Sequence, residues 1–186
     1  MHVGMSVIFQ NPGEELPDQQ VYQQDLALAL QAEPLGFDSV WSVEHHFTSY
    51  TMCPDVLQFL TYMAGATESV QLGSMVCVLP WHDPLRVIEQ ISMLDNLSGG
   101  RLILGLGRGT GKVEFDGFQT EMGSARLRFK ESTEMVLNAL ENGYAEYHGE
   151  LLDQPRVDIR PRPVKSMRGR AYAAAVSPDS ARIMAE

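Results

Sequence analysis

The sequence predicts an α/β fold built on a parallel sheet, and three observations predict it. Short apolar runs alternate with segments whose apolar residues recur at helical spacing. The apolar runs are continuous rather than alternating, which is typical of parallel strands covered on both faces. The strand–helix pair repeats four times with no linker or low-complexity tract, and a fifth strand with the start of a helix follows. The chain therefore reads as one domain made of about five βα units.

The first two units occupy residues 2–66. Residues 2–9 (HVGMSVIF) predict a buried strand, and an amphipathic helix begins at Asp18. The Pro and Gly of 34–36 end that helix. Residues 39–43 (SVWSV) predict the second strand, and 54–66 predict the second helix.

The next two units follow at once. Residues 70–79 (VQLGSMVCVL) predict the third strand. The Asp-Pro pair at 83–84 predicts a helix start, because Asp caps and Pro suits the first helical position. Ser-Gly-Gly at 98–100 ends this helix. Residues 101–106 (RLILGL) predict the fourth strand, and a glycine-rich loop is expected over 107–123.

The last part of the chain begins with a long helix over 124–141 that stops at Gly143. Residues 144–168, with three prolines, predict an irregular excursion or a short hairpin. Residues 170–176 (RAYAAAV) predict the fifth strand, and 177–180 (SPDS) start a helix. Because a domain rarely ends just inside an amphipathic helix, we expect the domain to be incomplete at its C-terminus. Periodicity leaves two architectures open, a doubly wound sheet and a (β/α)8 barrel, which typically needs ~250 residues.

Composition excludes several classes of protein. The chain of 186 residues has a net charge of −10 and 44% hydrophobic residues, so a basic nucleic-acid footprint is absent. Two cysteines, Cys53 and Cys77, are too few for a disulfide scaffold and favour a reduced, cytoplasmic setting. A basic–apolar leader and an apolar run of 18 residues are both missing, which disfavours secretion and membrane spanning.

Titratable residues follow the second predicted strand. Glu44, His45 and His46 place a carboxylate beside two imidazoles at the edge where parallel sheets bind ligands, so they could position a base or stabilise an anion. A solvated loop without a role is an equally good interpretation of this tripeptide. Zinc, with His82 and Asp83 as further ligands, is a weaker alternative, because no HExxH or CxxC spacing supports it.

Two further strand ends suit an anion. The run GLGRGTG (105–111) surrounds Arg108 with glycines, but it lacks the GxGxxG spacing of a dinucleotide site and could be only a flexible loop. Ser177 and Ser180 add a cap and a hydroxyl at a helix start, where free N–H groups attract phosphate. Arg108 on the neighbouring strand end strengthens the phosphate interpretation, although a plain capped helix is the alternative.

These strings, in this order, resemble the bacterial-luciferase-like family of flavin-dependent monooxygenases. The resemblance covers essentially the whole chain. Its matching runs are GFDSVW (36–41), EHHFT (44–48), VLP (78–80), DPLR (83–86), SGGR (98–101), GLGRG (105–109) and YAAAVS (172–177).

The resemblance implies a (β/α)8 TIM-type barrel, truncated here to about five βα units, with residues 1–186 forming one incomplete luciferase-like domain. It implies a cytoplasmic bacterial flavoprotein, an oxidoreductase that binds reduced FMN delivered transiently by a separate flavin reductase. With O2, the enzyme would oxidise a small organic substrate as a two-component monooxygenase. The 186-residue chain alone is expected to be inactive, because the shielding walls of the site would be missing. A homodimer through the second and third helices is also implied, with the candidate contacts Leu57, Leu60, Met63, Ile88, Ile91 and Met93.

The resemblance also implies roles for single residues. His45 would be catalytic, with Glu44 beside it near the flavin, and since neighbouring strand residues point to opposite sides, only one of His45 and His46 can face the cofactor. The family's phosphate ligands correspond to Arg108, Ser177 and Ser180. Backbone of Met75, Val76 and Val176 would line the isoalloxazine, with the Met75–Val76 bond matching a non-proline cis peptide of the family. No metal is expected.

One departure and two alternatives remain. The reactive cysteine of the luciferase alpha subunit is replaced by Gly107, so light emission is not expected. A deazaflavin-dependent oxidoreductase of the same superfamily would transfer hydride instead of activating oxygen. A non-catalytic flavin-binding relative would keep the barrel and lose the chemistry.

Overall fold

The strands of the central sheet are all parallel and follow one another in chain order. They are β1 (Gly4–Ser6), β2 (Ser39–Ser42), β3 (Gln71–Ser74), β4 (Cys77–Val78), β5 (Leu102–Gly107) and β8 (Ala171–Ala173). In the computed structural model, which describes residues 1–185, β1 pairs with β2, β2 with β3, and β3 and its continuation β4 with β5, which also pairs with β8. A doubly wound sheet reverses its strand order at a switch point, whereas a barrel does not, so this order indicates a barrel.

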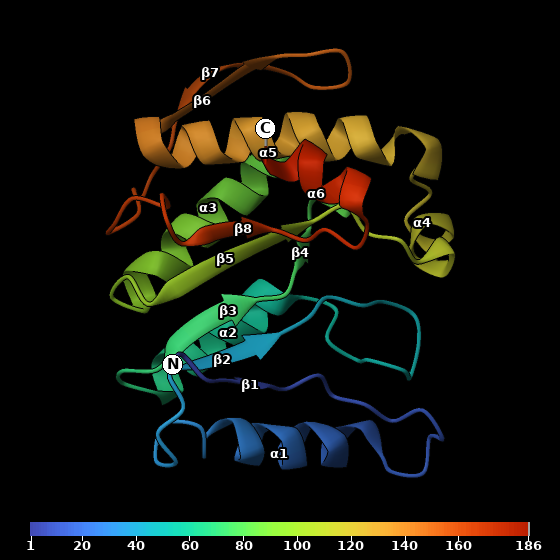
Figure 1. Ribbon diagram of the computed structural model, residues 1–186, viewed down its shortest axis with the longest axis vertical. Helices are drawn as coiled ribbons and strands as arrows, with labels where there is room; N and C mark the ends of the chain where they lie inside the picture. Colours follow the sequence, from blue (N-terminus) through green and yellow to red (C-terminus); the bar gives the residue numbers. More distant parts are fainter. Residues whose placement is uncertain (186) are drawn as a thin grey trace.

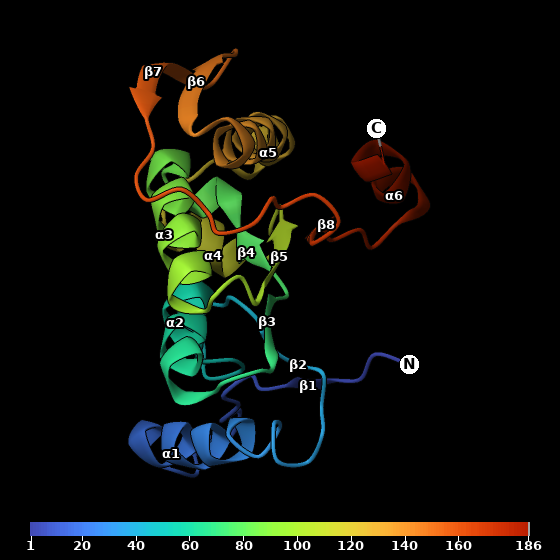
Figure 2. The ribbon, with the colours of Figure 1, turned by 90° about the vertical axis from the view of Figure 1, so that its left-hand side faces the viewer.

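The helices support the same conclusion. The longer ones are α1 (Asp18–Ala29), α2 (Val56–Ala66), α3 (Pro84–Leu97), α5 (Ala125–Asn142) and α6 (Pro178–Ala185). α1, α2 and α3 lie on one side of the sheet, and α5 packs on α3 (Figure 2). The continuous apolar runs fit this arrangement, because the second face of a barrel wall is covered by the barrel interior. Among the described residues, no helix combines the length and the apolar character needed to cross a bilayer.

An antiparallel hairpin lies outside this sheet. β6 (Tyr144–His148) pairs with β7 (Asp153–Asp158), beyond α5 as seen from the sheet (Figure 1). The hairpin is the short excursion that the prolines of 144–168 predict. β7 is mostly exposed, whereas β6 packs on α5 and buries Ala145 in the core.

The third predicted strand is divided in two. Residues 70–79 were expected to be continuous, but β3 ends at Ser74, the Met75–Val76 bond is cis, and β4 resumes at Cys77. Glycines on β5 allow this close approach. A Cβ at Gly105 would lie 2.1 Å from the carbonyl oxygen of Ser74, and one at Gly107 would lie 2.1 Å from Cγ2 of Val76. These glycines of the GLGRG run therefore make room for a neighbouring strand, in addition to any ligand.

The glycine-rich segment 107–123 was expected to be a loop but contains a helix, α4 (Lys112–Gly117). A 3-10 turn, η2 (Met122–Ser124), follows it. Phe115 buries its ring on one side of α4, and this single apolar anchor is too short a signal for helical periodicity. α4 lies beyond the carboxyl end of β5 (Figure 1).

The core lies between the sheet and its helices. Five of the six residues expected at a dimer interface are within it, at 0–4% exposure: Leu57, Leu60, Met63, Ile88 and Ile91. Met93, at 48%, is the sixth. The expected contact list was therefore wrong for five residues, because their helical faces pack on the chain's own sheet.

Trp41 occupies the opposite face of the sheet, between two glycines. A Cβ at Gly4 on β1 would lie 2.6 Å from the indole Nε1, and one at Gly73 on β3 would lie 2.3 Å from the indole Cε3. The indole N–H donates to Ser39 Oγ (2.7 Å). The ring thus extends over both neighbouring strands.

Arg101, the last residue of the SGGR run, has a structural role. Its guanidinium donates to the carbonyl oxygens of Ala64 (2.9 Å) and Thr67 (3.1 Å) at the end of α2, and to that of Val70 (3.0 Å) before β3. It satisfies carbonyl groups that the end of a helix leaves without partners.

Candidate functional site

A cavity of about 180 Å³ lies where β2, β4, β5 and β8 end. Its lining comes from residues that follow or end these strands and from α4 and α6: Val43, Glu44, His45, Met75, Val76, Val78, Trp81, Gly107, Arg108, Gly109, Thr110, Gly111, Glu114, Ala174, Val176, Ser180 and Met184. The cavity thus brings together the predicted residues Glu44, His45, Met75, Val76, Arg108, Val176 and Ser180, and of the predicted set Ser177 is not in the lining. A shallower hollow beside α1 is lined mainly by glutamines and holds no titratable side chain.

The two adjacent histidines point to different partners. His45 lines the cavity with 41% of its side chain exposed, and its Nδ1 lies 2.8 Å from Oε1 of Glu114. His46 is buried, with its Nε2 3.1 Å from Oε1 of Glu44. Of this pair, His45 is the one placed to meet a bound molecule.

Glu44 has a buried carboxylate whose oxygens are engaged by the protein. Oε1 lies 3.1 Å from Nε2 of His46 and 2.6 Å from Nε2 of His82, and Oε2 accepts the N–H of Val78 (2.8 Å). Burial raises the pKa of Glu44, but these hydrogen bonds outweigh burial, so the pKa is lowered. Burial lowers the pKa of His82, but Glu44 outweighs it and the pKa is raised. Glu44 therefore joins the end of β2 to β4 and to the residues after it, rather than offering a free carboxylate to a cofactor.

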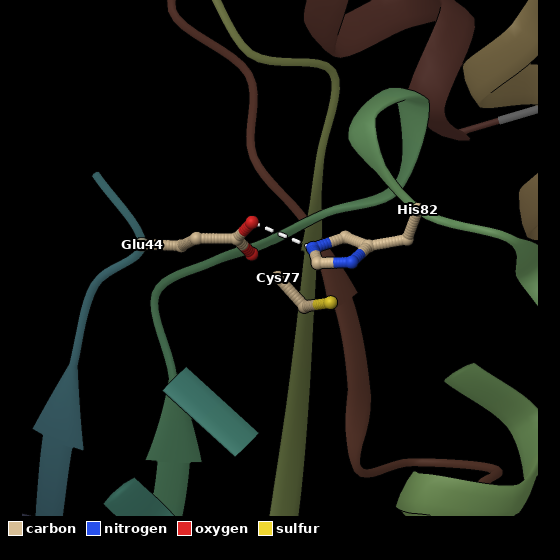
Figure 3. Close-up of side chains that lie close together, drawn as sticks. All are labelled: Glu44, Cys77 and His82. Carbon is tan, nitrogen blue, oxygen red and sulfur yellow. Dashed lines mark hydrogen bonds and ion pairs between the residues drawn. The ribbon is translucent and has the colours of Figure 1, made fainter. Parts of the chain in front are cut away.

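Glu44, Cys77 and His82 form the cluster in the described chain that most resembles a metal site (Figure 3). Their potential ligand atoms lie within 4.8 Å of one another. Burial and the charge of Glu44 raise the pKa of the Cys77 thiol well above its usual value, which disfavours the thiolate that metals bind. Glu44 and His82 already share a hydrogen bond, and Asp83, the other predicted zinc ligand, caps α3 instead. The chemistry of these donors does not favour zinc.

The predicted phosphate ligands lie at the start of α6 and the end of β5. The Ser177 hydroxyl lies 2.9 Å from the Ser180 hydroxyl and accepts the N–H of Ser180 (3.1 Å). Ser177 thus caps α6 and orients Ser180, which lines the cavity together with Arg108. This corner offers hydroxyl, N–H and guanidinium donors to an anion.

Part of the cavity lining is apolar. Met75, Val76 and Val176 all belong to it, and the Met75–Val76 peptide is cis, as the resemblance implies. The Met75 N–H donates to the Ser42 carbonyl oxygen (2.7 Å), which fixes this segment against the end of β2.

Glu114 and Trp81 are the site residues that the sequence did not reveal. Glu114 belongs to α4, within a segment expected to be a loop, and Trp81 belongs to the 3-10 turn η1 (Leu79–Trp81). One signal was present: Glu114 stands three residues after Gly111, the spacing at which a first-turn Glu folds back toward its helix cap.

Comparison with known proteins places this geometry in a family. Residues 1–186 match the family described as luciferase-like monooxygenase. The alkanal monooxygenase alpha chain of Photorhabdus luminescens is 32% identical over 130 residues, which are 70% of this chain and 36% of that protein. The first two curated relatives are matched over 40% and 47% of their length, so the chain spans less than half of them.

Solved structures agree. Monooxygenase RslO1 from Streptomyces bottropensis superposes with a TM-score of 0.90 at 31% identity, over 98% of this chain and 56% of that one. Two more distant neighbours share the fold. The oxygenating constituent of 3,6-diketocamphane monooxygenase from Pseudomonas putida, in complex with FMN, has a TM-score of 0.73 at 20% identity, over 83% of this chain and 44% of that one. An F420-dependent secondary alcohol dehydrogenase has a TM-score of 0.75 at 18% identity, over 98% of this chain and 55% of that one.

These neighbours confirm the predicted barrel fold, present here in part, and the match over all 186 residues shows the family of the chain. Both RslO1 and the alkanal monooxygenase alpha chain are monooxygenases by name. The chain belongs to the luciferase-like monooxygenase family.

Proposed function

We propose that the protein is an FMN-dependent, two-component monooxygenase that oxidises a small organic substrate with O2 and obtains reduced flavin from a separate reductase. The observation that carries the proposal is the single cavity that holds a histidine, an arginine beside a capped helix start, and an apolar wall. A cytoplasmic location belongs to the proposal, because the reductase and the reduced flavin are expected there.

The donors around the cavity suit FMN. Arg108, Ser180 and the start of α6 offer the charge-assisted and hydroxyl hydrogen bonds that a phosphate needs. Val76 packs closely on Gly107, where a side chain would collide with it, and both residues add apolar lining to the cavity. The enclosed 180 Å³ is less than the roughly 300–1,000 Å³ of complete ligand pockets, so these residues form part of a larger site.

Reduced FMN, when bound, would supply the electrons that activate O2. His45 would hold or move a proton at its Nε2, because its Nδ1 faces Glu114. Trp81 and Phe115, in edge-to-face contact (5.6 Å), would keep water from one side of the cavity. Glu44 would fix the backbone of β4 through the Val78 N–H and would take no direct part in the reaction.

The identity of the cofactor is tested first. We would measure binding of FMN and of the deazaflavin F420 to the full-length protein by fluorescence, and then substrate-dependent O2 consumption with NADH and a flavin reductase over a panel of aldehydes, ketones and aromatic compounds. FMN binding with oxygenated product supports the proposal. Tight binding of F420 alone, with hydride transfer and no O2 consumption, overturns it, and FMN binding with no turnover of any substrate favours a non-catalytic relative.

The phosphate corner has its own test. Arg108→Ala should weaken FMN affinity by about 10-fold or more, since it removes a charged partner worth ~1.5–3 kcal/mol. Binding of riboflavin, which lacks the phosphate, should change little. An equal loss for both ligands would show that Arg108 does not act on the phosphate.

A further inference from the structure

Glu114 is a buried carboxylate that reaches the candidate catalytic histidine from a distant part of the chain. Its side chain is 4% exposed, whereas the other acidic side chain of α4, Asp116, is 64% exposed and pairs with Lys112. The Glu114 Oε1 lies 2.8 Å from His45 Nδ1 and also accepts the backbone N–H of His46 (3.4 Å). Burying a carboxylate is costly unless it has partners, and these two hydrogen bonds are the partners that the site provides.

The helix that carries Glu114 is shaped to let the carboxylate fold back. Gly111 is the N-cap of α4, and a Cβ there would lie 1.6 Å from Oε2 of Glu114. The backbone of Gly111, at φ −77° and ψ 113°, is open to any residue. The backbone would therefore accept another residue at this position, but its Cβ would displace the carboxylate of Glu114.

The contact determines which imidazole nitrogen faces the cavity. A carboxylate offers only acceptors, so His45 must donate from Nδ1. In the neutral ring, a hydrogen on Nδ1 leaves Nε2 as the acceptor. Since His45 lines the cavity, the lone pair of Nε2 becomes available to a bound molecule.

Resting on the function proposed above, we infer that Glu114 is the positioning residue of the site, which holds His45 as the Nδ1–H tautomer so that Nε2 can accept a proton at the cavity. Gly111 serves the same purpose by leaving room for the carboxylate. Although Glu114 lines the cavity, in this role it acts through His45.

The tautomer is measured directly, without flavin or turnover. Full-length protein labelled with 15N-histidine gives long-range 1H–15N spectra at pH 8.5, about two pH units above the ordinary histidine range, and His45→Gln assigns the His45 signals. We expect a protonated Nδ1 in the wild type. Glu114→Ala and Gly111→Ala should both shift His45 toward the Nε2–H form. Asp116→Asn, the matched control on the same helix, should leave it unchanged.

Gly111→Ala keeps the carboxylate in the protein and only displaces it, so it tests geometry apart from charge. If Gly111 acts through Glu114 alone, the double variant should match Glu114→Ala. In the reductase-coupled assay, both single variants should lower kcat by about 10- to 100-fold with unchanged FMN affinity, the range for a lost orienting partner. Circular dichroism identifies any variant that fails to fold.

The outcomes separate the two claims. An unchanged His45 tautomer in folded Glu114→Ala overturns the inference, whatever the enzyme does. A changed tautomer with normal turnover leaves the positioning role standing and overturns the proposed proton transfer by His45. An effect of Glu114→Ala without any effect of Gly111→Ala overturns the role given to Gly111.

Discussion

At the scale of single residues, the histidine pair gives the sharpest expectation. His45→Ala should lower turnover by about 100-fold or more, the usual range for a lost general acid–base group. FMN affinity should persist, because the phosphate corner is formed by other residues. Steady-state kinetics with reductase-supplied flavin, together with a binding titration, would measure both.

His46 supplies the comparison for this prediction. Its ring is buried against Glu44 and packs edge-to-face on Phe118, with ring centroids 4.6 Å apart. His46→Ala should therefore lower the unfolding midpoint, while the folded fraction keeps most of its turnover. If activity were lost in His46→Ala and normal in His45→Ala, the chemistry would belong to His46 and the prediction for His45 would be wrong.

Glu33 gives a prediction about pH. The Ser69 hydroxyl and the successive N–H groups of Glu68, Ser69 and Val70 hold its carboxylate, which lowers its pKa to about 2. A depressed pKa stabilises the folded state above the unfolded value of about 4.5, and this contribution is lost as the pH falls toward 2. Glu33→Gln should therefore unfold at lower urea than the wild type at pH 7, with the gap closing between pH 4.5 and 2.5. A gap that is constant with pH would show that the charge of Glu33 is not what stabilises the turn.

Much of the site could be predicted at this scale, because His45, Arg108 and Ser180 stand in short runs at strand ends. Glu114 could not, since its partner His45 is 69 residues away and only the fold brings them together. Glu44 lies at the cavity, but the engagement of its carboxylate by His82 and Val78 could not be read from local spacing.

At the scale of elements, Arg101, which directly precedes β5, binds the end of α2 and the residues before β3. Arg101→Ala removes hydrogen bonds to the end of α2 and to the residues before β3, and leaves buried carbonyl groups without a donor. We expect a loss of about 2–4 kcal/mol in the free energy of unfolding, measured by urea denaturation. Arg86, whose ion pair with Glu89 is exposed, is the control, and its replacement by Ala should cost under about 1 kcal/mol. If Arg101→Ala lost no more free energy of unfolding than the control, Arg101 would not have the capping role.

The long helices could be predicted because their ends carry local chemistry. Asp83 caps α3 by accepting the N–H of Leu85 (2.8 Å), and Gly143 ends α5 in the left-handed region at φ 76°. The break between β3 and β4 could not be predicted. It depends on the absence of side chains at Gly105 and Gly107 on another strand, which local periodicity does not report.

At the scale of the whole molecule, a homodimer through α2 and α3 remains a proposal, and Met93 is the one contact kept from those first expected. Tyr62 on α2, and Met93 and Leu97 one turn apart on α3, are 48–58% exposed and are free of the core. Replacing Met93 and Leu97 by Asp should convert a dimer into a monomer in sedimentation velocity at micromolar concentration, since two buried charges would oppose association. Leu28→Asp, on the exposed side of α1, should leave the assembly unchanged. A monomeric wild type would end the proposal.

The architecture was only partly accessible from the sequence. Continuous apolar strands indicated a parallel sheet, but they could not show that its second face is the interior of a barrel. That face has a different composition from the helix-covered one, since it carries one indole and several residues without a side chain. These residues are Trp41, Gly4, Gly73, Gly105 and Gly107. Only the resemblance to a family of barrels separated the two architectures in advance.

The indole of Trp41 has a consequence for how strands find their partners. Parallel strands can slip past one another, and the smallest slip that keeps each side chain on its own face is two residues. Such a slip would set Gln71 or Met75 in the place of Gly73, or His2 or Ser6 in the place of Gly4, and each of these carries a Cβ where the ring already lies. Trp41 therefore favours the observed register of β1, β2 and β3, because its ring would clash with a side chain in each of the nearest shifted registers.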